Sequence, residues 1–181
     1  MHYKLGVNNI FITKLYGISQ DPETKNYIMV LDYAENGSLR NCLDTNYDKL
    51  SWNYKFFNLY DIANGLGIIH RKELIHRDLH IGNILSFSLY TSITDMGLCK
   101  PADYIASENT KKNTYGVLPY IAPEILRGQN YTRASDIYSF GIIMYEVFSG
   151  LPPYHDVSHD NNLSMKICLG LRPRFNIKVP N

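Results

Sequence analysis

An eight-residue stretch, His-Arg-Asp-Leu-His-Ile-Gly-Asn at positions 76–83, contains the residue types best suited to chemistry in this chain. It follows a helix-like segment that ends near Arg71, so we expect it to form a short loop. A carboxylate and an amide on such a loop suit phosphoryl transfer, which needs a group to accept the proton of an attacking hydroxyl and an oxygen ligand for Mg²⁺. Asp78 fits the first role and Asn83 the second.

Two further motifs follow in order, Asp-Met-Gly at 95–97 and Ala-Pro-Glu at 122–124. Loop 76–83 resembles the catalytic loop of protein kinases. The Asp-Met-Gly sequence resembles their metal-binding motif, and Ala-Pro-Glu resembles the end of their activation segment. The sequences at 116–124 and 136–141 are similar to the tyrosine-kinase-like branch of that family, in which many members are serine/threonine kinases.

The resemblance implies an α+β, protein-kinase-like fold with a mostly helical large lobe and a remnant β-hairpin of the small lobe. Residues 1–35 would hold the small-lobe remnant and the hinge, and residues 36–181 would form a large lobe that lacks its last helices. ATP and Mg²⁺ are the implied cofactors, with Asp95 joining Asn83 as a metal ligand.

The same resemblance places the adenine base beside the segment that follows the second predicted strand. Leu31 would be the gatekeeper beside the adenine pocket, and the backbone of Asp32 and Ala34 would hydrogen-bond adenine. Ser38 would lie near the ribose, and Leu85 would form the floor under the base. These assignments rest on alignment with the family, because backbone contacts depend little on side-chain identity.

The chain also departs from the family pattern. It shows no glycine-rich phosphate loop and no Val-Ala-Ile-Lys-like strand, so the lysine that holds the nucleotide phosphates is missing. His80 stands where the family has Lys, and Val117 where serine/threonine kinases have Thr. We expect His80 to replace the lysine conditionally, as an imidazolium favoured by Asp78 and by phosphate. The alternative is a solvent-facing residue without a role.

Apolar periodicity and turn residues predict the elements that must position these residues. The predicted elements are strands at 9–19 and 27–33, a short helix at 39–43 capped by Ser38, a longer helix after Ser51, a hairpin of 84–85 with 91–94, and helices at 123–127, 136–147 and 162–169. One apolar face of the longer helix is predicted to comprise Trp52, Phe56, Leu59, Ala63 and Leu66. The resemblance implies that Asp136 bonds back to loop 76–83.

Composition excludes several classes of protein. Eighteen Lys and Arg balance seventeen Asp and Glu, so bulk charge favours neither nucleic-acid nor membrane binding. No apolar run approaches the roughly 18 residues that a membrane span needs, and the N-terminus lacks a signal-peptide pattern. Three widely spaced cysteines form no disulfide or metal pattern, which favours a reducing, cytoplasmic location.

Arg77, the residue before the candidate base, predicts regulation by phosphorylation. Arg77 could pair with a phosphate placed by an upstream kinase on Thr110, Thr114 or Tyr115, because arginine binds phosphate through charge-assisted hydrogen bonds. The alternative is an ordinary polar loop. In the family the residue at the position of His76 packs beneath the metal-binding motif, so His76 is not expected to act as a base.

Two functions stay open. One is an ATP-dependent protein kinase in intracellular signalling that phosphorylates a protein hydroxyl, with Ser/Thr favoured and Tyr not excluded. The other is an impaired fragment or pseudokinase that acts as a protein-binding scaffold. The complete set of base and metal residues favours the first, and the missing lysine and glycine loop favour the second for the isolated chain.

Overall fold

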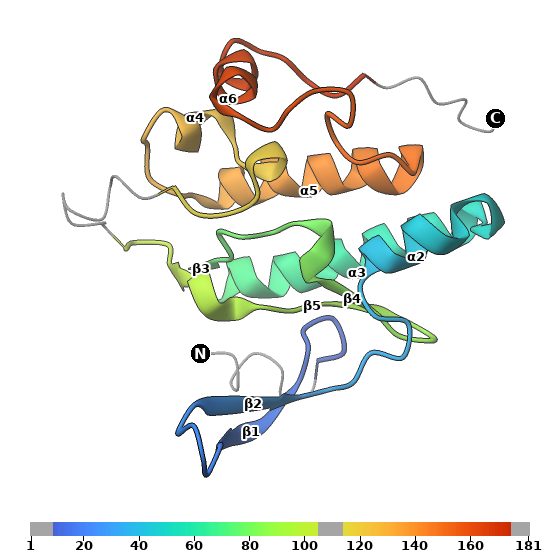
Figure 1. The fold of residues 1–181 in the computed structure, drawn as a ribbon, viewed down its shortest axis with the longest axis vertical. Coiled ribbons are helices and arrows are strands. Elements are labelled where there is room, and N and C mark those ends of the chain that lie inside the picture. The colour runs from blue at the N-terminus through green and yellow to red at the C-terminus, as the bar shows by residue number, and fades with distance from the viewer. Residues whose placement is uncertain (1–8, 105–113, 175–181) are drawn as a thin grey trace.

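The computed structural model describes residues 9–104 and 114–174 (Figure 1). These residues form helices and small two-stranded antiparallel sheets, which confirms the predicted α+β class. The strands are β1 (Leu15–Gln20), β2 (Tyr27–Leu31), β3 (Leu74–Ile75), β4 (Ile84–Ser86), β5 (Thr91–Ile93) and β6 (Lys100–Pro101). The α-helices are α2 (Leu39–Asn46), α3 (Trp52–Arg71), α4 (Pro123–Leu126), α5 (Arg133–Ser149) and α6 (Asn161–Cys168), and the 3₁₀ helices are η1 (Tyr47–Lys49), η2 (Ile81–Asn83), η3 (Met96–Leu98) and η4 (Leu118–Tyr120).

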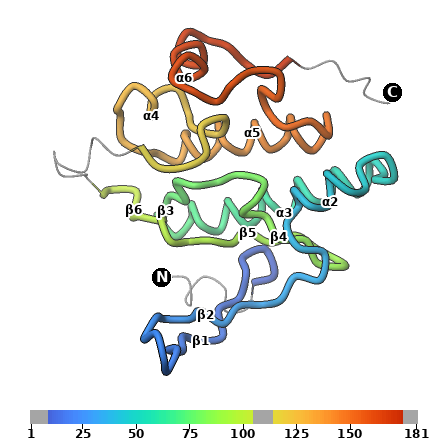
Figure 2. Tube along the Cα trace, in the orientation of Figure 1, coloured from blue at the N-terminus to red at the C-terminus, as the bar shows by residue number. Residues whose placement is uncertain are grey.

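The two longest helices, α3 and α5, lie at the centre of the molecule and pack against each other (Figure 1). The β1–β2 hairpin lies at one end of the molecule, and α4 and α6 lie at the other (Figure 2). Loop 76–83 follows α3 and β3 and packs against the first turn of α5. The centre of the fold therefore positions the residues that the sequence singles out.

Both central helices begin at polar caps. The Ser51 side chain accepts a hydrogen bond from the Tyr54 amide at 3.1 Å, as its predicted N-cap role requires. Helix α5 begins at Arg133 rather than at the predicted Asp136, because Thr132 and Ser135 form a reciprocal capping box. It ends at Gly150, whose φ of 69° lies in the left-handed region that glycine adopts without strain.

The predicted apolar face of α3 is partly wrong. Phe56 is 54% exposed and Ala63 is also exposed, whereas Ile62 and Ile69 are fully buried. The buried face is rotated from the predicted stripe because it includes polar side chains that an apolar pattern overlooks. These polar residues are Lys55, Asn58 and Asp61. The ammonium group of Lys55 lies over the Tyr47 ring at 3.6 Å, and the Asp61 carboxylate accepts the Thr91 amide at 2.9 Å.

The predicted β1–β2 hairpin is confirmed, but its first strand is shorter than residues 9–19. Residues 11–13 instead pair with β5, through the Thr13 amide to the Ile93 carbonyl and the Ile93 amide to the Phe11 carbonyl, both at 2.9 Å. Gly65 of α3 permits this close packing, since a Cβ atom there would lie 2.6 Å from the Phe11 carbonyl oxygen.

The other short elements agree largely with the sequence. The β4–β5 hairpin and helices α2, α4 and α6 lie where they are predicted, and α2 extends to Asn46. The pairing of β3 with β6 was not predicted. Thr110 lies outside the described residues. In the described ranges, no helix combines the length and the apolarity that crossing a membrane would require.

Candidate active site

Asp136 holds loop 76–83 from the first turn of α5. Its carboxylate accepts hydrogen bonds from the backbone amides of His76 at 2.8 Å and of Arg77 at 3.0 Å. The Nε2 atom of His70, in the last turn of α3, lies 2.9 Å from the same carboxylate. Asp136 is only 1% exposed, so its removal would leave buried amides without a partner. The expectation that Asp136 bonds back to the loop is confirmed.

His76 joins the loop to the strand that leads to Asp95. Its Nε2 atom lies 3.0 Å from the Thr94 carbonyl oxygen, and its Nδ1 atom accepts the Asp78 amide at 3.3 Å. An imidazole that donates at one nitrogen and accepts at the other is neutral. Complete burial also lowers the pKa of His76. This geometry fits a packing residue rather than a base.

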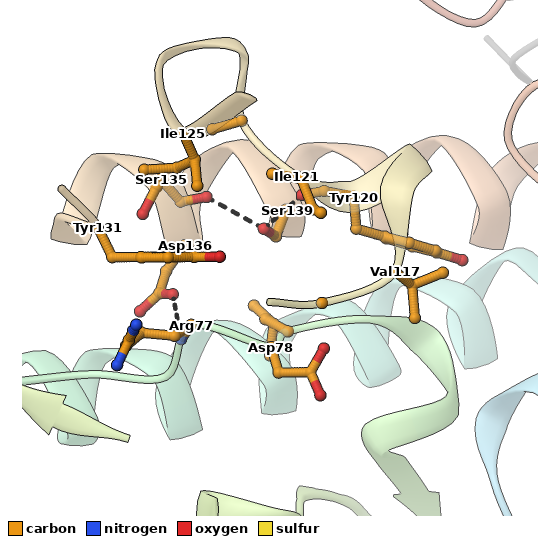
Figure 3. Close-up of a pocket in the computed structure, with 13 residues that line it drawn as sticks. Arg77, Asp78, Val117, Tyr120, Ile121, Ile125, Tyr131, Ser135, Asp136 and Ser139 are labelled. Carbon is orange, nitrogen blue, oxygen red and sulfur yellow. Dashed lines mark hydrogen bonds between the residues drawn. The ribbon is translucent and has the colours of Figure 1, made fainter. Parts of the chain in front are cut away.

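Asp78 and Asn83 meet at the outer side of the loop. The Asn83 side-chain nitrogen donates to the Asp78 backbone oxygen at 3.0 Å and lies 3.5 Å from its carboxylate. Because the amide nitrogen faces Asp78, the amide oxygen faces away from it. The Asp78 side chain is 19% exposed, and Figure 3 shows its carboxylate turned away from Asp136. The Asp78 carboxylate can therefore meet a ligand.

Asp95 is brought next to Asn83 by the backbone. The Thr94 amide donates to the Asn83 carbonyl at 2.9 Å, at the end of the β4–β5 hairpin. Asp95 has a φ of 55°, a left-handed conformation that side chains other than glycine rarely adopt. Its exposed carboxylate accepts the Gly97 amide at 3.2 Å. Two separate sequence motifs are therefore joined by a backbone hydrogen bond beside Asn83 and Asp95.

These oxygen atoms suit Mg²⁺ in kind. Mg²⁺ favours one or two carboxylates, retains several waters and takes phosphate oxygens from a nucleotide. Across residues 9–104 and 114–174, no cluster of three or more His, Cys, Asp or Glu side chains could hold a metal ion by itself. Asn83 and Asp95 therefore fit a magnesium site that a nucleotide completes.

His80 lies beside Asp78 rather than in solvent. Its Nε2 atom is 3.8 Å from the Asp78 carboxylate, and its side chain is 20% exposed. Its Nδ1 atom accepts the Gly82 amide at 3.1 Å, which requires that nitrogen to be unprotonated. Asp78 favours the imidazolium, as expected, but burial outweighs this effect and lowers the pKa of His80. The imidazole is therefore neutral near pH 7 without a ligand.

The residues predicted to contact adenine and ribose lie on the segment that joins β2 to α2. Leu31 ends β2, and the Asp32 amide donates to the Lys14 carbonyl at 3.1 Å. In this described segment no hydrogen bond is recorded to the Asp32 carbonyl or from the Ala34 amide, which leaves one acceptor and one donor for a base. A backbone bridge joins Ser38 to Leu85.

The hydroxyl of Ser38 already has a structural role. It accepts the Asn41 amide at 3.3 Å as the N-cap of α2, which confirms the predicted cap. Within the described residues, no hydrogen bond joins this adenine-side group to Asp78. The structure thus gathers the predicted site residues into two groups, one at the hinge segment and one at loop 76–83.

A family model described as protein tyrosine and serine/threonine kinase matches residues 4–175. The chain belongs to the protein kinase family. Loop 76–83 is therefore the catalytic loop of a protein kinase domain, and the activation segment runs from the Asp-Met-Gly motif to Ala-Pro-Glu.

Relatives in this family include both substrate classes. The chain is 36% identical to the serine/threonine-protein kinase Sgk2 of Rattus norvegicus over 82% of this chain and 39% of that protein. It is 32% identical to the serine/threonine-protein kinase-like protein CCR4 of Arabidopsis thaliana over 86% of this chain and 21% of that protein. It is 29% identical to the tyrosine-protein kinase SPK-1 of Girardia tigrina over 81% of this chain and 30% of that protein. The chain spans less than half the length of the curated relatives it matches.

The end of the kinase activation segment closes over the catalytic loop (Figure 3). Gly116 has a φ of 108°, and a Cβ atom there would lie 3.4 Å from the Asp78 carboxylate. The cavity between the segment, the loop and α5 measures only about 10 Å³ and is lined by Arg77, Val117 and Tyr131 among others. This volume is close to that of one water-sized probe, so the packing here is tight.

Sequence reasoning missed a buried polar network beside the kinase loop. Glu146 of α5 is fully buried, accepts the Tyr120 hydroxyl and pairs with Arg40 of α2. Burial raises the pKa of Glu146 to about 7, although Tyr120 and Arg40 both act to lower it. The Tyr120 ring lies 5.9 Å from the His80 ring. The available signal was a glutamate within an otherwise apolar stretch of helix.

Proposed function

We propose that this chain transfers the γ-phosphate of ATP to a protein hydroxyl, with Ser and Thr favoured over Tyr. The observation that carries the proposal is that Asn83 links Asp78 to Asp95: its side chain bonds to the Asp78 carbonyl, and its own carbonyl accepts the amide of Thr94, the residue before Asp95. Asp78, Asn83 and Asp95 are the base and metal ligands that phosphoryl transfer requires. Two of the three relatives described above carry serine/threonine-kinase names, which supports the preferred hydroxyl class.

In this proposal Asp78 accepts the proton of the substrate hydroxyl. The side chains of His76 and Asn83 bond to the backbone amide and carbonyl of Asp78, so the backbone that carries the carboxylate needs little reorganisation during the reaction. Gly116 lies against this carboxylate, since a Cβ atom there would be only 3.4 Å from it. His80 holds its Nε2 atom near Asp78 and would donate a hydrogen bond to that carboxylate or to phosphate.

Asn83 and Asp95 would hold Mg²⁺ through their oxygen atoms. When bound, this ion neutralises charge on the nucleotide phosphates. The carbonyl of Asp32 and the amide of Ala34 would bond the adenine edge, between Leu31 and Leu85. Ser38 would lie near the ribose while its hydroxyl caps α2.

The setting of this function is also proposed. All three cysteines are unbonded thiols, which fits a reducing compartment such as the cytoplasm. The substrate would be a protein, and an upstream kinase could act on Thr114 or Tyr115. The near balance of charge supports neither nucleic acid nor membrane as a partner.

The test is phosphoryl transfer by the full chain from labelled Mg-ATP to peptide libraries with one central Ser, Thr or Tyr. We expect labelling of the Ser and Thr libraries that disappears when Mg²⁺ is chelated. Asn83→Ala and Asp95→Ala should each weaken Mg²⁺-dependent nucleotide binding, measured by calorimetry. Labelling no greater than without the protein would reject catalysis and favour the alternative of a protein-binding scaffold.

A further inference from the structure

Arg77, the residue before the proposed base, is in an unusual environment. Its φ is 74°, a left-handed conformation that costs free energy for a residue other than glycine. Its backbone amide is held by Asp136 at 3.0 Å. Because Arg77 and Asp78 are adjacent, whatever fixes the Arg77 side chain also helps to fix the Asp78 carboxylate.

The guanidinium of Arg77 is held by aromatic rings. Its central carbon lies 4.5 Å from the centre of the Tyr131 ring and 5.6 Å from that of Tyr115. No carboxylate lies within ion-pair distance of Arg77 in the part of the chain that the structure describes. A guanidinium over an aromatic face is stabilised by the ring electrons, more strongly where water is excluded. Within the described residues, the guanidinium is therefore contacted by the two rings and by the Leu98 carbonyl at 3.5 Å.

Tyr131 also binds the activation segment directly. Its hydroxyl accepts the Tyr115 amide at 2.9 Å and donates to the Tyr115 carbonyl at 2.6 Å. One side chain thus satisfies both backbone groups of a single residue, as the partner in a β-ladder would. Burial raises the pKa of Tyr131, so its hydroxyl keeps its proton at neutral pH.

Tyr115, which Tyr131 holds, is next to the residue that lies against the proposed base, Asp78. Gly116 follows Tyr115, and a Cβ atom at Gly116 would lie 3.4 Å from the Asp78 carboxylate and 3.6 Å from the Arg77 carbonyl. Figure 3 shows the Tyr131 ring over Arg77, with Asp78 beyond it. The cavity that Arg77 and Tyr131 line measures only about 10 Å³, so the two side chains pack closely.

We infer that Tyr131 is a positioning residue that clamps the end of the activation segment to Arg77, so that Asp78 is aligned without phosphorylation of that segment. The clamp itself does not depend on activity, whereas its effect on the rate of phosphoryl transfer rests on the proposed kinase function. The sequence-based expectation is that Arg77 binds a phosphate on Thr110, Thr114 or Tyr115. In the inferred mechanism, tyrosine rings and one hydroxyl supply the contacts instead.

The test compares hydrogen exchange in the full chain after phosphatase treatment, for the parent and for Tyr131→Phe. The phenylalanine keeps the ring over Arg77 but removes both hydrogen bonds to Tyr115. We expect the Tyr115 amide to exchange at least about tenfold faster in the variant, with exchange in α5 unchanged. Tyr60→Phe removes an exposed hydroxyl on α3 and is the matched control, for which no change is expected.

A second variant and a kinetic measurement complete the test. Arg77→Lys keeps the charge but loses the planar group that stacks on the rings, so exchange at Tyr115 should also rise. In the phosphorylation-free chain, Tyr131→Phe should lower kcat more than it raises the KM for ATP. Unchanged Tyr115 exchange in both variants would overturn the clamp whether or not the chain is active. Protection at Tyr115 that appears only after phosphorylation would also overturn it.

Discussion

The catalytic loop and the β1–β2 hairpin supply the two sides of the proposed nucleotide site, yet they are held very differently. The loop rests on the buried carboxylate of Asp136 and on the buried imidazole of His76. In the hairpin, Ile18, Met29 and Val30 are 46–65% exposed, and the two strands form a sheet of their own. The phosphate side is thus built into the core, while the adenine side lies on a weakly packed element.

This difference indicates that local stability is lower in the hairpin than in the catalytic loop. An isolated two-stranded hairpin is marginally stable in water, and elements with little burial open locally at low free-energy cost. The catalytic loop should therefore keep its geometry when the hairpin frays. Changes to the loop and its supports should alter chemistry and global stability, and changes to the hairpin should alter mainly nucleotide affinity.

The largest effect is expected from Asp78→Asn. The asparagine nearly preserves shape but removes the proton acceptor, a contribution that is typically worth ~10²–10⁴-fold in rate. We expect phosphoryl transfer to fall by at least that factor, with nucleotide affinity within a few-fold of the parent. Initial rates with labelled Mg-ATP and calorimetric binding would measure the two effects separately.

The matched control for this substitution is Asp48→Asn, at an exposed carboxylate in η1. Its transfer rate should equal that of the parent. If Asp78→Asn retained the parental rate while Asp95→Ala lost nucleotide binding, the loop would be a binding element rather than a catalytic one.

Much of this phosphate side could be predicted from the sequence, because its signals are local. Asp78, Asn83 and Asp95 stand in short ordered motifs, and Ser51 and Gly150 mark helix ends through the chemistry of single residues. The hydrogen bonds that Asp136 accepts from the loop join distant parts of the sequence, and they were predicted through the family resemblance. Local rules therefore located the residues, and the resemblance linked them.

The missed features all depend on contacts between distant segments. The pairing of Arg40 with Glu146 and the bonds from Tyr131 to Tyr115 involve side chains that no periodic pattern marks. The buried face of α3 was misplaced for a related reason. Lys55 is buried against the ring of Tyr47, which precedes the helix, and against the ring of Trp52, in the preceding helical turn. Polar burial follows from tertiary partners, which an apolar pattern cannot reveal.

A smaller effect should distinguish the catalytic loop from the β1–β2 hairpin by the change in the free energy of unfolding. Asp136→Ala leaves the buried amides of His76 and Arg77 without an acceptor, and breaking a buried charged network typically costs ~3–5 kcal/mol. Met29→Ala truncates a side chain that is 59% exposed, so its cost should stay below about 1 kcal/mol. Urea unfolding followed by circular dichroism would give both values.

Helix α5 provides a control for the size of these numbers. Ile143→Ala removes a fully buried apolar side chain and should cost about 2–5 kcal/mol without affecting the loop directly. Equal losses from Met29→Ala and Ile143→Ala would show that the hairpin is part of the core after all, which would contradict the comparison.

The last expected effect concerns pH and the buried carboxyl group that sequence reasoning missed. Burial raises the pKa of Glu146 to about 7 from an ordinary value of 4.5. The folded state therefore holds a proton that the unfolded chain has already lost, and the free energy of unfolding should fall as pH rises from about 4.5 through about 7. With roughly 1.4 kcal/mol for each pKa unit, the rise from 4.5 to about 7 corresponds to at most about 3.5 kcal/mol.

Glu146→Gln isolates this contribution, because glutamine keeps the size of the side chain and does not titrate. The stability of the variant relative to the parent should therefore rise between pH 5 and pH 8, as measured by urea unfolding at each pH. His80 lies near Tyr120 and has a lowered pKa, so its contribution has the opposite sign and is lost as pH falls below about 6.5. It is present in both proteins and should largely cancel in the difference. A difference that stays constant over this range would mean that Arg40 keeps Glu146 ionised throughout, and that the network is an ion pair at every pH tested.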